Sequence, residues 1–257
     1  MPRHARKISS TGIYHLIIRG INKEPIFLED EDRHRFLETL LRISVDTNAT
    51  ILGYCLMDNH VHLLIREGTN SISNLMHRLN ASYAYYFNWK YERSGHVFQN
   101  RFKSENVEDE AYLMAVLRYI HNNPVKAGMI YKPEVYQWSS CKVYYGGKDY
   151  LAGLTDKELV LGLFSDNTKE AVKEFRKFSE METIDVCMTY TAETKLSDAK
   201  ALQVIKEVLG EMPLDKLKEM HIAERNAILQ KLKSIKGLSI RQIARLTGVG
   251  VNIVKRA

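Results

Sequence analysis

The sequence predicts an α+β domain with an antiparallel sheet and helices, followed by an all-helical region. Up to about residue 124, segments with two-residue alternation and segments with helical spacing follow in the order strand, helix, strand, strand, helix, strand, helix. Beyond about residue 150, strand signals almost vanish. We therefore expect one domain at 1–150, a helical connector at 151–190 and a second domain at 191–257.

The first half of the α+β domain is predicted to contain a strand, a helix and a β-hairpin. Residues 12–19 alternate and are rich in branched side chains, which is typical of a strand. Residues 30–47 place apolar side chains at helical spacing. Two further strands, 50–57 and 60–66, are separated by an Asp-Asn pair that suits a tight turn.

The second half of this domain is predicted to hold a long helix, a short strand and a second helix. The long helix covers about 71–93, with Gly95 as its C-terminal cap. A short extended piece follows at 103–107. The second helix, 109–123, begins with two acidic residues and ends before a proline. The connector opens with a capping-box pattern at 155–158.

Composition indicates which binding partners and which cellular compartment to expect. The chain has 37 Lys and Arg against 31 Asp and Glu, a net charge of +6 that favours polyanionic partners. Its three cysteines are far apart and form no CxxC, so neither a disulfide framework nor a cysteine zinc site is expected. The basic N-terminus has no apolar region behind it, and no apolar run of about 18 residues exists. A reducing cytoplasm is the expected location, with no membrane partner.

Two histidines one residue apart are the first candidate site. On a strand, His60 and His62 share one face, while Val61 and Leu63 point to the other. The pair puts two imidazole nitrogens at a spacing that suits metal ligands. The alternative is that both are ordinary hydrogen-bonded histidines on a half-exposed face.

A tyrosine on the 109–123 helix is the second candidate. Tyr119 and Asn123 are four residues apart and share a helix face. Tyr119 lies off the centre of the apolar stripe, so the core does not require it. Tyr112 has nearly the same direction, but Val116 follows it one turn later. The alternative is a surface tyrosine, and the proline after Asn123 would loosen the helical spacing.

Several motifs in order resemble one family. "MDNHVHLLI" resembles the His-hydrophobic-His motif of the HUH nucleases, and "LRYIHNNPVKAGM" resembles the helix of their single-tyrosine transposases. "YHLIIRGINKEPIF", "GHVFQNRFKS" and "YQWSS" resemble further parts of the REP-associated tyrosine transposases, which are similar to insertion-sequence transposases. The resemblance runs from about Ile13 to Ser140.

The resemblance implies a ferredoxin-like fold and a DNA strand-transfer enzyme. His60, His62 and Asn123 would hold a divalent metal, and Tyr119 would attack a phosphodiester of single-stranded DNA at hairpin or repeat sequences. Ligand chemistry leaves the metal open between Mn²⁺ and Mg²⁺. One alternative is a non-catalytic DNA-binding regulator that retains the fold. A weaker alternative is a metal hydrolase that uses the histidine pair.

DNA contacts in the first domain are predicted from basic residues. The 71–93 helix interleaves aromatic and basic side chains, a combination that suits single strands. The alternative is that its aromatic residues form a core stripe, so only charged residues are predicted as contacts. They are Arg19, Arg78, Lys90, Arg101 and Lys103.

The C-terminal region is predicted to be a helix-turn-helix. Residues 225–257 contain eight basic residues and no acidic one. Ala244 is small where two helices would cross, Gly248 falls at the turn and Val254 would pack inward. The module resembles the DNA-binding domain of the bacterial replication initiator, with a second helix that starts near Gly250. The alternative is a helical bundle of another purpose, and a homodimer is left open. The predicted duplex contacts are Arg241, Arg245, Asn252, Lys255 and Arg256.

Overall fold

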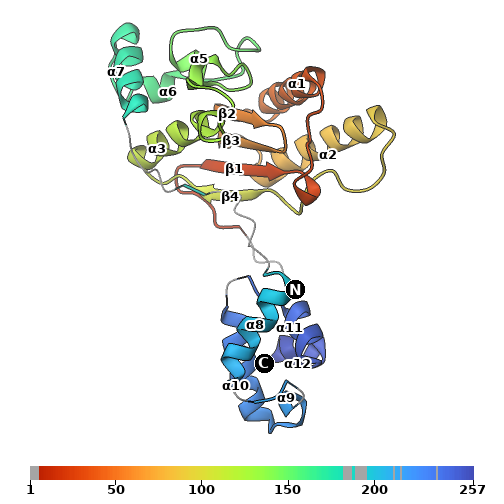
Figure 1. The fold of residues 1–257 in the computed structure, drawn as a ribbon. Coiled ribbons are helices and arrows are strands. Elements are labelled where there is room, and N and C mark those ends of the chain that lie inside the picture. Colours follow the sequence, from red (N-terminus) through yellow and green to blue (C-terminus); the bar gives the residue numbers. More distant parts are fainter. Residues whose placement is uncertain (1–5, 182–186, 189–195, 211, 215, 236) are drawn as a thin grey trace. The chain divides into compact units, whose positions relative to one another are not determined.

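The chain divides into two compact units, Met1–Thr189 and Tyr190–Ala257. The computed structural model describes residues 6–181, 187–188 and 196–257, apart from 211, 215 and 236. The first unit combines helices with a sheet, and the second is helical throughout its described part (Figure 1). Among the described residues, no helix is both long enough and apolar enough to cross a bilayer.

The first unit is built around a four-stranded antiparallel sheet in the order β2-β3-β1-β4. The chain alternates strands and helices as β1, α1, β2, β3, α2, β4, which is the ferredoxin-like arrangement that the motifs imply. The elements are β1 (Ile13–Arg19), α1 (Asp30–Thr47), β2 (Thr50–Met57), β3 (His60–Arg66), α2 (Ile72–Lys90) and β4 (Lys103–Asn106).

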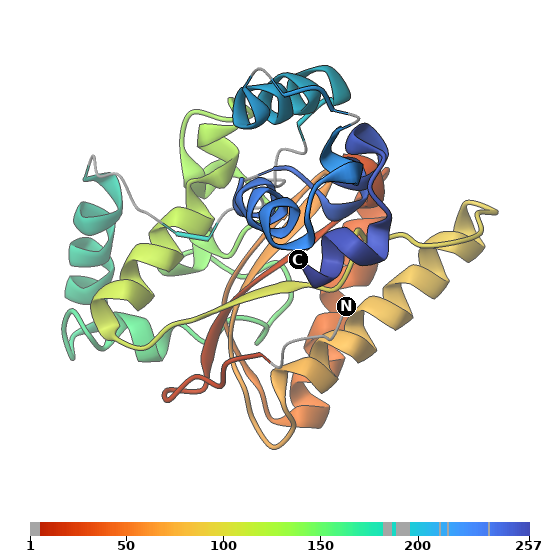
Figure 2. The same ribbon diagram turned by 90° about the horizontal axis from the view of Figure 1, so that it is seen from below.

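Helices cover both faces of the sheet. α1 and α2 lie on one face, and α3 (Glu110–His121) lies on the other (Figures 1 and 2). Gly53 of β2 allows α3 to approach closely, because a Cβ at this position would lie 2.5 Å from Leu117 Cδ1. The shorter elements of this unit are η1 (Ile21–Lys23), α4 (Asn123–Lys126), η2 (Pro133–Val135), α5 (Cys141–Tyr144), α6 (Glu158–Leu161) and α7 (Thr168–Glu180).

The segment predicted as a connector contributes to the core of the first unit. Val160 and Phe175 are fully buried in the same apolar cluster as the sheet and α3. The rings of Phe175 and Tyr144 stack at 4.9 Å. The second boundary that the sequence suggests, around 187–195, lies mostly outside the described residues.

Two predicted helix ends are wrong in detail. At 155–158 no capping box forms. α6 begins at Glu158, whose backbone N–H donates a hydrogen bond of 3.0 Å to the Asp156 carboxylate. α2 ends at Lys90 with Tyr91 as its cap, so Gly95 lies beyond the helix in a turn with φ +91°. In both places a hydrogen bond with another nearby residue already pairs a backbone group at the helix end, so the predicted residue does not form the cap.

The second unit has its own apolar core. α11 (Ile240–Thr247) is capped by Gly248, which has φ +68°, and a short turn leads into α12 (Val251–Arg256). Ala244 and Val254 are buried, as predicted, whereas Ile253 is 39% exposed. The helices are α8 (Asp198–Leu209), α9 (Lys216–Glu219), α10 (Ile222–Ser234), α11 (Ile240–Thr247) and α12 (Val251–Arg256).

Candidate active site

The register of the sheet gathers polar side chains on the face that α3 covers. His60 on β3 lies opposite Arg19 on β1, and His15 on β1 lies opposite Glu105 on β4. Directly paired residues of an antiparallel sheet share a face. The polar side chains of this face, taken along β1, β3 and β4, are His15, Arg19, His60, His62, Arg66, Lys103 and Glu105.

The structure brings the histidine pair and Tyr119 together. The ring centroids of His60 and His62 are 5.1 Å apart, and those of His62 and Tyr119 are 5.6 Å apart. His62 is only 1% exposed, so the half-exposed face that the alternative reading supposes is wrong for this residue. It is buried because α3 and the ring of His15 cover it.

The hydrogen bond of His60 leaves one ring nitrogen available. His60 Nδ1 lies 2.7 Å from the side-chain oxygen of Asn59, which can only accept, so Nδ1 carries the proton. Burial and the charge of Arg19 lower the pKa of His60 to about 4. At neutral pH the ring is therefore uncharged, and the lone pair of Nε2 is available to a ligand.

His15 is a site residue that sequence reasoning missed. Its Nε2 lies 3.0 Å from His62 Nδ1, and its Nδ1 lies 3.5 Å from Glu105 Oε2, an ion-pair distance. If the Nδ1–H of His15 faces the carboxylate, its Nε2 accepts a hydrogen bond from His62 Nδ1. The lone pair of His62 Nε2 then stays available. The only sequence signal was a single histidine within an otherwise apolar strand.

Glu105 is held as a carboxylate. Burial opposes ionisation, but hydrogen bonds from His15, from Tyr112 and from the backbone N–H of Met188 keep the pKa of Glu105 below its ordinary value. A carboxylate behind a histidine fixes the ring orientation and the tautomer of that histidine. Glu105, His15 and His62 therefore form a connected chain of polar groups.

Tyr119 is buried rather than on the surface. It is 7% exposed, since the rings of His15 and His62 contact it and Lys126 Nζ lies 4.8 Å from its ring centroid. Burial, together with the negative character of Cys187 and Glu105, raises the pKa of Tyr119 to about 12. The phenol is thus protonated at neutral pH in the ligand-free protein.

Asn123 stays one turn after Tyr119 despite the following proline. Its side-chain Nδ2 donates to the carbonyl oxygen of Tyr119 at 2.8 Å, which holds the amide on the same helix face. The side-chain oxygen remains available as an acceptor. Among the described residues, Asn123 makes no hydrogen bond to either His60 or His62.

The metal donors expected from the sequence are two imidazole nitrogens and one amide oxygen. In the part of the chain that the structure describes, no group of three or more His, Cys, Asp or Glu could hold a metal ion. The residues nevertheless fit a divalent cation, because His60 and His62 are neutral and their second nitrogens are engaged.

Arg19 and Lys103 both face the site, and the positive charge of Arg19 acts on His60. Arg101 lines a pocket beside α2. Arg78 forms an ion pair of 2.7 Å with Asp46. These four positions of the predicted DNA contacts are therefore spread over both sides of the sheet.

The structure does not favour Lys90 as a DNA contact. Its Nζ lies 3.0, 2.8 and 2.9 Å from carboxylates of Glu29, Glu31 and Asp32, in that order. The side chain is only 16% exposed and holds the end of α2 to the start of α1. Sequence spacing could not reveal this partnership, because α1 and α2 are far apart along the chain.

The predicted duplex contacts lie at the surface of the second unit. Arg241 is exposed on α11. Arg245 is also exposed, but it forms an ion pair of 2.5 Å with Asp198. On α12, Asn252, Lys255 and Arg256 are exposed while Val254 faces inward.

Comparison with known proteins relates part of the first unit to a family. Residues 9–123, less than half of the chain, match the family model described as "Transposase IS200 like". These residues are therefore similar to an IS200-like transposase domain. The matched range includes the histidine pair, Tyr119 and Asn123. No curated protein matches the chain.

Two solved structures resemble the chain at 18% identity. A REP-associated tyrosine transposase bound to a REP hairpin aligns over 61% of this chain and 94% of its own, with a TM-score of 0.48. A protein from Deinococcus radiodurans R1 that is assigned to the transposases aligns over 47% and 96%, with a TM-score of 0.33. Both scores are below 0.5, so the similarity to a transposase domain rests on residues 9–123.

Proposed function

We propose that the transposase-like domain cleaves and rejoins single-stranded DNA at hairpin or repeat sequences through a covalent bond between Tyr119 and a phosphate. The observation that carries the proposal is the cluster of Tyr119, His60 and His62 on one buried face. A DNA-binding regulator would not need a pair of neutral imidazoles with available lone pairs, His60 and His62, with a phenol packed against His62.

The reaction is a transesterification. The phenol oxygen of Tyr119 attacks phosphorus, the bond from phosphorus to the DNA 3′ oxygen breaks, and the phenolic proton ends on the released 3′-hydroxyl. One phosphodiester is exchanged for another, so the strand can be rejoined by the reverse reaction without a nucleotide cofactor. The high pKa of Tyr119 means that the phenol must lose its proton within the complex with DNA.

His60, His62 and Asn123 are the proposed ligands of a divalent cation, Mn²⁺ or Mg²⁺. Such a cation would polarise the scissile phosphate and neutralise charge in the transition state. His15 and Glu105 orient His62 for this role through the 3.0 Å hydrogen bond between the rings. Arg19 and Lys103, on the same face, are the proposed contacts to the flanking phosphates.

The second unit is proposed to bind duplex DNA. α11 and α12 follow the helix-turn-helix pattern, and α12 exposes Asn252, Lys255 and Arg256. A recognition helix places exposed polar residues against base edges and phosphates. The protein would then combine a single-strand enzyme with a duplex-binding module.

The decisive experiment is a denaturing gel of the protein incubated with labelled single-stranded DNA and Mn²⁺. The wild-type protein should form a covalent adduct, and Tyr119→Phe should form none because it lacks only the attacking oxygen. Tyr131→Phe is the matched control, since Tyr131 is fully exposed. Mass spectrometry should place the nucleotide on Tyr119. A regulator would form no adduct at all, and cleavage that persists in Tyr119→Phe would favour the metal-hydrolase alternative.

A further inference from the structure

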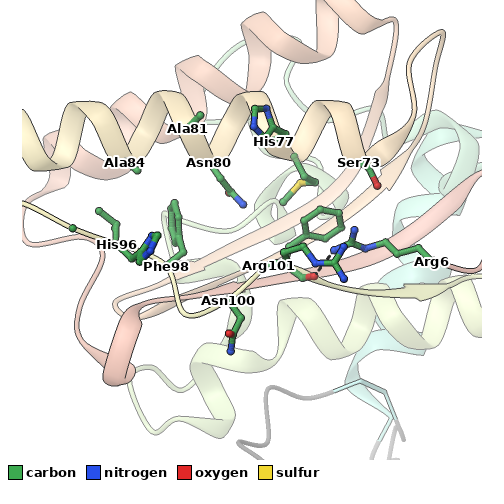
Figure 3. Close-up of a pocket in the computed structure, with 14 residues that line it drawn as sticks. Arg6, Ser73, His77, Asn80, Ala81, Ala84, His96, Phe98, Asn100 and Arg101 are labelled. Atoms are coloured by element: carbon green, nitrogen blue, oxygen red, sulfur yellow. Dashed lines mark hydrogen bonds between the residues drawn. The ribbon is translucent and has the colours of Figure 1, made fainter. Parts of the chain in front are cut away.

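A second candidate binding site lies beside the β4 edge of the sheet. It is a cavity of about 640 Å³ between α2 and the segment 95–102, and the Arg6 side chain closes one end (Figure 3). This volume is within the range of ~300–1,000 Å³ that is typical of small-molecule sites. We call this cavity the edge pocket.

The edge pocket carries positive charge without a counter-charge. Arg6 and Arg101 line it, and no Asp or Glu is among its described lining residues. The guanidinium of Arg6 stacks 3.7 Å above the Phe102 ring and donates to the Phe102 carbonyl oxygen at 2.8 Å. Burial and the nearby charge of Arg101 lower the pKa of Arg6. An anionic ligand would relieve this repulsion.

The remaining walls are suited to an aromatic ligand. Phe98 contributes a ring surface, and Asn80 extends from α2 toward the segment that contains Phe98 (Figure 3). The side-chain oxygen of Asn80 is buried and has no hydrogen-bond partner within the described part of the chain. An amide can pair with the edge of a nucleobase, and aromatic rings can stack on its face.

The edge pocket is close in the fold to the catalytic face. Its wall continues β4 alongside β1, because Gln99 N donates to the Arg19 carbonyl at 2.8 Å and Ile21 N donates to the Val97 carbonyl at 2.9 Å. Arg19 in turn lies opposite His60. The pocket and the catalytic face therefore lie on the two sides of the same sheet edge.

We propose that the edge pocket binds one unstacked nucleotide of a single-stranded DNA whose neighbouring segment lies on the catalytic face. The base lies against Phe98 and pairs with the Asn80 amide, and its phosphate contacts Arg6 and Arg101. That the bound nucleotide belongs to the substrate strand rests on the proposed function. Binding of a nucleotide in the edge pocket does not itself require cleavage.

The first test measures the affinity of the full chain for a short fluorescein-labelled single strand, without divalent metal. Ala81→Phe places a ring at the exposed rim of the pocket without changing the charge. It should weaken binding about tenfold, as expected when one stacked base is lost. Ala152→Phe is the control: Ala152 is exposed in the loop beside β2, at the opposite edge of the sheet, and this variant should bind like wild type.

The Arg101→Gln variant removes a positive charge from the edge pocket and so tests the contribution of charge to DNA binding, whereas Ala81→Phe tests the contribution of pocket shape. Arg101→Gln should weaken binding and reduce the slope of log affinity against log salt by about 1, whereas Ala81→Phe should leave that slope unchanged. Equal affinity of wild type and Ala81→Phe would overturn the proposal.

Photocrosslinking decides the location even if a pocket variant fails to fold. Wild-type protein with strands that contain 4-thiothymidine should crosslink within residues 73–84 or 95–102. Crosslinks confined to other peptides would refute the edge pocket. Tyr119→Phe should retain these crosslinks. Crosslinks here without any Tyr119 adduct would refute the proposed chemistry alone, and an adduct without these crosslinks would refute the pocket alone.

Discussion

His15 and His62 share a hydrogen bond inside the protein, so the position of each ring restricts the other. His15 is fully buried, and its other nitrogen faces a carboxylate that is kept ionised. A ring in this position sets the tautomer of its neighbour. Removing His15 should therefore affect metal binding more than folding.

We predict that His15→Ala weakens Mn²⁺ binding by about 10–100-fold, the usual effect of losing a group that orients a ligand. The measurement is a titration of free Mn²⁺ by electron paramagnetic resonance, which needs no DNA. His15→Gln should recover part of the affinity, because its amide oxygen can accept from His62. His34→Ala removes an exposed histidine and should change nothing. Unaltered Mn²⁺ affinity in His15→Ala would exclude the orienting role.

A second buried histidine makes stability depend on pH. Burial lowers the pKa of His121 to about 3, and its Nε2 lies 2.9 Å from Ser140 Oγ. The unfolded chain, with a histidine pKa of about 6.5, binds the proton first as the pH falls. Stability from this group is therefore complete above pH 6.5 and is lost as the pH falls toward 3.

We predict that the free energy of unfolding of wild type falls by about 2 kcal/mol more between pH 7 and pH 5 than that of His121→Gln. Glutamine keeps a polar group for Ser140 but takes up no proton. Urea unfolding at the two pH values measures the difference. The same pH dependence in both proteins would mean that His121 is not the titrating group.

At the scale of elements, the contact between β2 and α3 positions Tyr119, the proposed nucleophile. The absent side chain at Gly53 lets Leu117 pack against the sheet, and Tyr119 lies on the same helix. Helix and strand thus form a unit in which a shift of α3 displaces Tyr119 relative to His62. A substitution at Gly53 therefore tests whether the contact between β2 and α3 is needed for the site.

We predict that Gly53→Ala lowers stability by about 1–3 kcal/mol, the usual cost of overpacking, and slows adduct formation at 25 °C while the protein remains folded. Urea unfolding and the adduct assay measure the two effects. The double variant Gly53→Ala, Leu117→Ala should lose less stability than the sum of the single variants, since the overlap is relieved. Additive losses would argue against a direct clash.

At the scale of the whole molecule, the two units have separate cores. The apolar cluster of the first unit contains the sheet, α1, α2, α3 and α7, and a second cluster lies within α8–α12. Separate cores allow each unit to fold by itself.

We predict that a chain ending at Thr189 still forms the Tyr119 adduct with single strands but loses most of its affinity for duplex DNA. Its duplex binding should also depend less on salt, because basic contacts are lost. Lys255→Ala with Arg256→Ala in the full chain should reproduce part of this loss. Gel-shift assays at two salt concentrations provide the measurement, and equal duplex affinity in the short and full chains would count against the helix-turn-helix role.

The sequence by itself determined the features that depend on neighbouring residues. Alternation and helical spacing predicted the strands, α1 and the tight turn of the hairpin, because side-chain direction repeats every 2 or 3.6 residues. The His-x-His spacing and the Tyr119–Asn123 spacing are local in the same sense, so the candidate site was visible before the fold.

Only the tertiary structure decided which distant residues support that site. His15 and His62 are 47 positions apart and meet through the register of β1 and β3. The burial of Tyr119 and the attachment of Lys90 to the start of α1 likewise result from packing between elements. Periodicity gives the direction of a side chain but not its partner across a sheet or on another helix. That choice depends on strand order, register and close packing of the folded chain.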